Sequence, residues 1–128
     1  MILNLTDMSD EPLQGQIERQ VRAKILSGEF KADAALPSIR GLAKTHKVSV
    51  ITVQRAYEAL LRENLIHSRR GKGFFVSKIN RQNKKDLARQ RLYQNLERPV
   101  QAALAEGLSM GEIRKVIDEI ARHHPLHS

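Results

Sequence analysis

A chain of 128 residues has the length of one compact domain with a small appendage. It contains no cysteine, which excludes disulfides and thiolate metal sites, and its acidic start, with Asp7, Asp10 and Glu11, is unlike a secretion signal. No stretch approaches the roughly 20 apolar residues of a membrane span, so we expect a soluble cytoplasmic protein.

The formal net charge of +8 is concentrated between residues 69 and 91. This window holds nine basic residues and one acid, Asp86, so the rest of the chain is close to neutral. A concentrated positive stretch attracts a polyanion such as nucleic acid. On charge alone, a solvated linker is an equally good interpretation.

In chain order, the first helix is expected to begin near Asp10, a good N-cap, with Pro12 close to its start, and to stop at Gly28. An apolar residue recurs at every fourth position of this helix, namely Leu13, Ile17, Val21 and Ile25.

Two further helices are expected after the N-caps Ser38 and Ser49. The first is short and ends at His46-Lys47, whereas the second is longer and ends near Glu63-Asn64. A short helix, a turn of a few residues and a longer helix form the helix-turn-helix arrangement.

Residues 65–68 and 74–77 are expected to form two short strands around the glycine-containing loop 69–73. A two-stranded hairpin is marginal alone, so Ile66, Phe75 and Val76 are expected to pack on the preceding helices. Helices followed by such a hairpin predict a winged helix.

The remainder is expected to be helical. Residues 80–85 look like a linker or a frayed helix start, and a helix from Asp86 to Gly107 is expected to kink or break at Pro99. Ser109-Met-Gly-Glu112 is a capping box that opens a last helix, closed by His123-His124-Pro125.

We therefore predict a mainly α fold with a small β-hairpin: a winged helix-turn-helix domain over residues 1–78 and a helical dimerisation tail over residues 79–128.

The longer helix of the helix-turn-helix is the candidate for contact with bases, because residues near the N-terminus of such a helix meet base edges in the major groove. An ordinary exposed helix face is the alternative. Arg40, one helix earlier, is placed to meet a phosphate or a base at the groove edge. The predicted base-contacting residues are Ser49, Val50, Thr52, Gln54 and Arg55.

The loop Arg69-Arg70-Gly71-Lys72-Gly73 favours DNA over that alternative. Glycines let a backbone approach closely, and flanking arginines suit a narrow, electronegative minor groove. The position of this loop, just downstream of a candidate recognition helix, is where a minor-groove contact belongs.

The order of motifs resembles the GntR family of bacterial regulators over roughly residues 10–77. The matching segments are Pro12-Leu13, Gln16-Ile17, Ile25, Gly28, Leu36-Pro37-Ser38-Ile39-Arg40, Leu42-Ala43, Val48-Ser49, Thr52-Val53, Ala56-Tyr57, Leu60, Leu65-Ile66, Arg70-Gly71-Lys72-Gly73 and Phe75-Val76. The resemblance implies DNA contacts at Arg40, Thr52, Gln54, Arg70 and Gly71. One departure lies near Ala32-Asp33, where the family usually has Pro-Gly; we expect a different turn there, without effect on binding.

The two-helix tail resembles that of the YtrA-like subfamily, in which it serves mainly in dimerisation. Its two apolar stripes are also more than one helix pair can cover, which predicts a homodimer, although both stripes packing back on the winged helix is an alternative. The predicted dimerisation residues are Leu92, Leu96, Val100, Leu104, Met110, Ile113, Val116, Ile117 and Ile120.

The sequence thus predicts a sequence-specific transcription regulator, in the simplest case a repressor, that binds an inverted-repeat operator in double-stranded DNA as a homodimer. Two alternatives remain: a sequence-independent architectural DNA-binding protein and an interaction module for acidic proteins. We expect no enzyme and no cofactor, because neither a catalytic constellation nor a phosphate-binding glycine loop is present. His123, His124 and His127 are interpreted as a solvated tail rather than a metal site.

Overall fold

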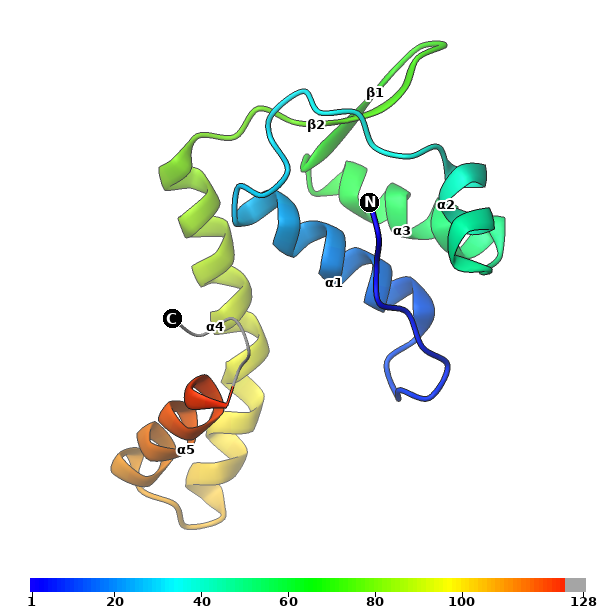
Figure 1. The fold of residues 1–128 in the computed structure, drawn as a ribbon. Helices are drawn as coiled ribbons and strands as arrows, with labels where there is room; N and C mark the ends of the chain where they lie inside the picture. The colour runs from blue at the N-terminus through cyan, green and yellow to red at the C-terminus, as the bar shows by residue number, and fades with distance from the viewer. Residues whose placement is uncertain (124–128) are drawn as a thin grey trace. The chain divides into compact units, whose positions relative to one another are not determined.

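The computed structural model describes residues 1–123 and divides into two compact units, Met1–Lys85 and Asp86–Ser128 (Figure 1). The predicted fold class is confirmed: the chain is mainly helical, with a single two-stranded antiparallel sheet in the part described. None of its described helices is both long and apolar enough to cross a membrane.

The first unit contains a three-helix core and the hairpin. Its elements are α1 (Leu13–Leu26), α2 (Ile39–His46), α3 (Val50–Arg62), β1 (Ile66–Arg69) and β2 (Gly73–Val76). Helix α3 is central, because it contacts α1, α2 and β1. The side chains that are almost fully buried between these elements include Ile17, Val21, Ile25, Leu42, Val53, Tyr57, Leu60, Ile66 and Val76.

Most predicted helix ends are confirmed, but the start of α1 is not at Asp10. Ser38 and Ser49 cap α2 and α3, and Gly28 has the expected left-handed backbone with φ 85°. Helix α1 instead follows Pro12, which offers no side-chain cap. Proline disfavours helical backbone at the residue before it, here Glu11, and so disfavours a helix that starts directly after Asp10.

Residues 3–6 form an N-terminal strap whose backbone is bound by side chains of the helices. The Gln20 amide pairs with both backbone groups of Asn4, each at 2.8 Å. The Gln16 amide does the same for Thr6, at 2.9 and 2.8 Å. The Leu3 N–H donates to His46 Nε2 at 2.9 Å. The backbone groups of Asn4 and Thr6 are therefore paired without a neighbouring strand.

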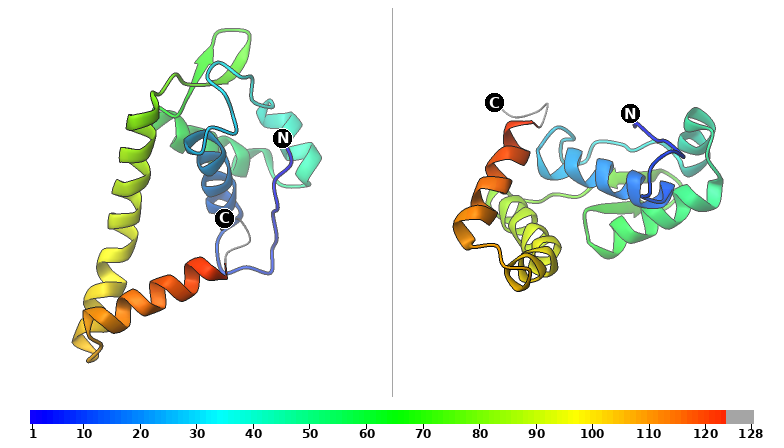
Figure 2. Two further views of the ribbon diagram at one scale, coloured as in Figure 1. Left: turned by 60° about the vertical axis from the view of Figure 1, so that its left-hand side comes forward. Right: turned by 90° about the horizontal axis from the view of Figure 1, so that it is seen from below.

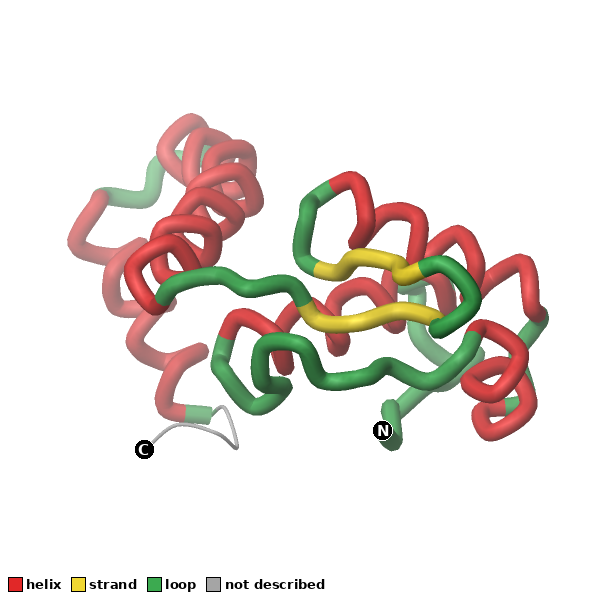
Figure 3. Tube along the Cα trace, turned by 90° about the horizontal axis from the view of Figure 1, so that it is seen from above, coloured by secondary structure: helices red, strands yellow, loops and turns green. Residues whose placement is uncertain are grey.

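The hairpin carries a third extended segment along its free edge, residues 33–36, which lies beside β2 in Figure 3. The Leu36 N–H donates to Phe74 O, and the Val76 N–H to Ala34 O, both at 2.9 Å. Ile66 and Val76 are paired and buried as predicted, but Phe75 faces the other side. Because successive residues of a strand alternate between faces, Phe74 contacts Tyr57 in the core, with ring centroids 5.0 Å apart, in place of Phe75.

The tail consists of α4 (Arg81–Ala105), which begins at the end of the first unit, and α5 (Met110–Arg122). Of the kink or break expected at Pro99, the break is wrong, because α4 continues through this residue (Figure 2). Good helix formers on both sides outweigh the one backbone donor that proline lacks. The capping box of Ser109 and Glu112 is confirmed. His123 caps the end of α5, while His124, Pro125 and His127 lie outside the described residues.

Candidate nucleic-acid interface

The helix-turn-helix is held rigidly from within. Ser38 Oγ accepts the Gly41 N–H and so caps α2; a Cβ at Gly41 would lie 2.9 Å from that oxygen, so a larger residue there would require the Ser38 side chain to shift. The turn between the helices is closed by Lys47, with φ 55°, and by the hydrogen bond from Val48 N–H to Ala43 O. These contacts fix α3 relative to α2.

Tyr57 adds a bond between the middle of α3 and the start of α2. Its hydroxyl donates to Pro37 O at 2.8 Å, and its side chain is fully buried. Burial raises the pKa of the Tyr57 hydroxyl, because the phenolate form would lose its hydration. The hydroxyl therefore stays protonated and remains a donor, which keeps the outer face of α3 in one orientation.

The outer face of α3 carries the predicted base-contacting residues. Val50, Gln54 and Arg55 are exposed, whereas Thr52 is half-buried and its hydroxyl lies 2.8 Å from Ser49 Oγ. Ser49 Oγ also accepts the Thr52 N–H, so Ser49 has a structural role at the start of the helix. The outer face of α3 thus carries an amide, a guanidinium and apolar groups. Side chains with these groups distinguish base pairs in the major groove, by hydrogen bonds to base edges and by contact with thymine methyl groups.

Ile51 belongs to this face and was missed. It is exposed one turn before Arg55 and opposite the buried Val53 and Tyr57. A large apolar side chain facing water at the N-terminal end of a helix suits contact with a thymine methyl group. The signal was in the sequence, since three-and-four spacing from the buried residues places position 51 outward.

Arg40 is exposed in the first turn of α2, as expected for contact with a phosphate. Gln54 has one neighbour within its own helix: its amide donates to Glu58 at 3.2 Å. Such a pair between residues four apart stabilises a helix by only about 0.2–0.5 kcal/mol, so Gln54 is readily released for another partner.

The tip of the wing is a tight turn formed by Arg70, Gly71 and Lys72. The Lys72 N–H donates to Arg69 O at 2.9 Å, and Gly71 and Gly73 have φ of 73° and 102°, conformations that favour glycine. The side chains of Arg70 and Lys72 are exposed at this tip. No ion pair is recorded for either among residues 1–123.

Arg69 differs from its two basic neighbours. It lies 3.1 Å from Asp33 Oδ1 and 4.4 Å from the centre of the Phe75 ring. The predicted basic stretch is thus divided into three parts. Arg70 and Lys72 are exposed at the wing tip, and Arg69 is paired at the base of the wing. The remaining basic residues lie in α4 or shortly before it.

The predicted dimerisation residues are mostly uncovered within one chain. On α4, Leu92 and Leu104 are exposed and Leu96 and Val100 are half-buried; on α5, Met110, Val116, Ile117 and Ile120 are exposed. Ile113 is the exception, because only 6% of it is accessible, so it belongs to the unit's own core.

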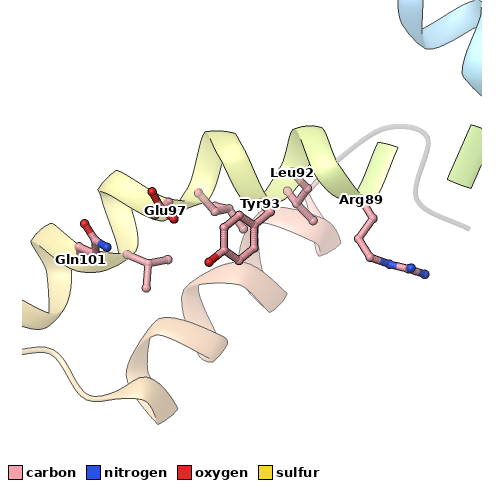
Figure 4. A pocket seen from close by; sticks show the side chains of 7 residues that line it. Arg89, Leu92, Tyr93, Glu97 and Gln101 are labelled. Atoms are coloured by element: carbon pink, nitrogen blue, oxygen red, sulfur yellow. The ribbon is translucent and has the colours of Figure 1, made fainter. Parts of the chain in front are cut away.

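A groove runs along the exposed side of α4 (Figure 4). Apolar side chains form its floor, among them Leu92 and Tyr93, while Arg89, Glu97 and Gln101 lie along it. Tyr93 was not among the predicted dimerisation residues, although its exposure and its place beside Leu92 make it part of the same surface. An apolar surface of this extent on one helix pair is typical of a contact with another molecule.

A comparison with protein-family models matches residues 13–76, half of the chain, to the bacterial regulatory proteins of the gntR family. The HTH-type transcriptional repressor NagR of Bacillus subtilis (strain 168) is 37% identical over 76 residues, which cover 59% of this chain and 31% of that protein. The HTH-type transcriptional repressor YtrA of the same strain is 34% identical over 76 residues, covering 59% and 58%. The match therefore spans less than two thirds of either relative.

Solved structures match over more of the chain. A transcriptional antiterminator from Listeria monocytogenes EGD-e is 26% identical with a TM-score of 0.75, covering 94% of this chain and 90% of that one. YtrA from Sulfolobus acidocaldarius, a GntR-family transcription factor, is 29% identical with a TM-score of 0.59, covering 94% and 97%. The DNA-binding domain of AraR in complex with the operator ORE1 is 25% identical with a TM-score of 0.50, covering 60% and 94%.

Proposed function

Because the chain belongs to the gntR family of bacterial regulatory proteins, we propose that it is a sequence-specific DNA-binding transcription regulator that represses from an inverted-repeat operator as a homodimer. The observation that carries the proposal is the outer face of α3, where Gln54 and Arg55 stand exposed on a helix fixed at its start by Ser49. The relatives named above are regulators rather than enzymes, which supports a role in binding rather than catalysis.

The chemistry of this face suits the major groove. Gln54 can pair with adenine through both its amide groups, and Arg55 with guanine through two guanidinium N–H donors. Val50 and Ile51 offer apolar contact to thymine methyl groups. Arg40 and the wing tip then supply contacts to the phosphate backbone or the minor groove, which hold the helix in its register.

Dimerisation follows from the uncovered apolar surface of the tail and from the shortness of one recognition helix. One winged helix contacts only a few base pairs, whereas two linked copies double the site and act at a high effective concentration. A symmetric dimer meets DNA best on an inverted repeat with half-sites about one helical turn apart. Occupation of such a site near a promoter would exclude the polymerase.

The test is to recover bound DNA genome-wide, derive the operator and compare its affinity with that of unrelated duplex DNA. A regulator should prefer its operator at least roughly a thousandfold. Gln54→Ala should weaken operator binding by about 1–3 kcal/mol and relax one base preference. Arg62→Ala, at the far end of the same helix, is the control and should leave the base preference unchanged.

Three outcomes would count against this function. Equal affinity for all duplexes would favour an architectural DNA-binding protein, and no binding to any duplex would favour a module for acidic proteins. An unchanged base preference in the Gln54 variant would remove α3 from the contact with bases.

A further inference from the structure

Asp33 lies in the left-handed backbone region, with φ 65°, where residues other than glycine are uncommon and Asn and Asp are the best tolerated. Its N–H donates to Val76 O at 2.8 Å, so the hairpin itself holds it in this conformation. This is the segment in which the family usually has glycine. The sequence predicted that this turn would not affect binding, but the turn places a carboxylate beside an arginine of the wing.

The carboxylate is paired with an arginine of the wing. Arg69 Nη2 lies 3.1 Å from Asp33 Oδ1, and the guanidinium also covers the Phe75 ring at 4.4 Å. Residues 33 and 69 are far apart in sequence, and the pair joins the segment before α2 to the last residue of β1 across β2.

This pair contributes little to folding. The two side chains are 47% and 51% exposed, and exposed ion pairs typically stabilise a protein by less than about 1 kcal/mol. Its main consequence is electrostatic, because it neutralises one of the three cations of the wing. Arg70 and Lys72, which follow immediately, have no such acidic neighbour among the recorded ion pairs of residues 1–123.

We propose that Asp33 is a positioning residue that, together with the Phe75 ring, holds Arg69 at the base of the wing and withholds it from DNA phosphates. The inference rests on the proposed function and deepens it. Arg70 and Lys72 are then the wing cations that meet DNA, and Arg69 supports the hairpin through Phe75. Asp33 thereby lowers the sequence-independent part of DNA affinity by about one phosphate contact.

The experiment measures the salt dependence of binding to one unrelated duplex by fluorescence anisotropy between 50 and 200 mM salt. Wild type, Asp33→Asn, Arg69→Gln and the double variant are compared. Asparagine tolerates the same backbone conformation but carries no charge. Asp33→Gly, which also tolerates it, is the second variant should the first fail to fold, as judged by far-UV spectra.

Asp33→Asn should steepen the salt slope by about 0.9, because each phosphate contact releases counterions in that proportion. Over this fourfold range of salt, the steeper slope corresponds to about 3.5-fold more loss of affinity than in wild type. Arg69→Gln alone should leave the wild-type slope unchanged, and the double variant should return to it.

Three results would overturn the proposal while leaving DNA binding intact. A flatter slope in Arg69→Gln would mean that Arg69 already contacts a phosphate. Equal steepening by Asp33→Asn with and without Arg69 would mean that Asp33 repels DNA directly. An unchanged salt slope in Asp33→Asn would mean that Asp33 does not keep Arg69 away from DNA phosphates. A wild-type protein that binds no duplex would overturn the proposed function itself, and this inference with it.

Discussion

The uncovered apolar face of α5 gives the sharpest test of the proposed dimer. The residues to change are Ile117 and Ile120, which lie one turn apart on the exposed side of that helix. Ile113, on the same stripe, is unsuitable because it is buried in the unit's own core and its replacement would unfold the tail. We expect Ile117→Glu/Ile120→Glu to be a folded monomer.

The size of the effect follows from exposure. Ile117 is 42% and Ile120 66% accessible, so together they offer a partner about one isoleucine of apolar surface. Burying one isoleucine side chain is worth about 1.5–3 kcal/mol, and two protomers contribute, which gives about 3–6 kcal/mol per dimer. Since 1.4 kcal/mol is a factor of ten, dissociation should become at least about a hundredfold more favourable, before the repulsion between buried glutamates is included.

Light scattering gives the mass, and far-UV circular dichroism tests whether the helices remain. Lys115→Glu is the matched control, because it changes the net charge by the same two units and lies on the opposite, exposed side of α5. It should remain a dimer. The monomeric variant should keep weak, salt-sensitive DNA binding but lose most of its preference for the operator.

A stable dimer of the double variant would place the interface elsewhere, on the α4 groove alone or outside the tail. An unfolded chain would mean that Ile117 and Ile120 are needed within one protomer. Either result refutes the assignment of this face to a second copy.

The other predictions concern the wing, the core and the last helix. Arg70→Ala should flatten the salt slope by about one unit if Arg70 meets a phosphate, and a loss that depends on A·T content would instead place it in the minor groove. Tyr57→Phe leaves Pro37 O without its donor and should lower the unfolding free energy by about 1–3 kcal/mol in a urea titration; an unchanged midpoint would contradict this. The backbone N–H of Ser109 donates to Glu112 and lowers the pKa of that carboxyl, so the cap stabilises α5 above the ordinary pKa of about 4.3 and is lost as the pH falls through the lower, folded value. A carboxyl titration by NMR at the ordinary pKa would refute this.

Local chemistry made much of the fold predictable. Ser38, Ser49 and Ser109 cap the helices they were expected to cap, because an N-cap depends on a side chain and an N–H only three residues away. The same holds for Gly28 and Gly107, whose positive φ values end helices.

The features that the sequence did not predict depend on contacts between distant segments, or on a balance between local preferences for and against helix. The Asp33–Arg69 pair exists only because the hairpin folds back on the segment before α2. Pro99 was expected to interrupt a helix that its neighbours carry through. Ile51 and Tyr93 were absent from the predicted contact residues, although both are exposed beside residues that were predicted, Val50 and Leu92.

Two side chains of α1 hold the N-terminal strap at the same time, because two lengths nearly coincide. Four residues of helix rise about 6 Å, and two residues of extended chain advance about 6.6 Å. The side-chain amides of Gln16 and Gln20, four residues apart on α1, can therefore form hydrogen bonds with every second residue of an extended segment beside the helix. Because both amides bind backbone groups of the strap, replacing the side chain of Asn4 or Thr6 should leave both pairs of hydrogen bonds in place.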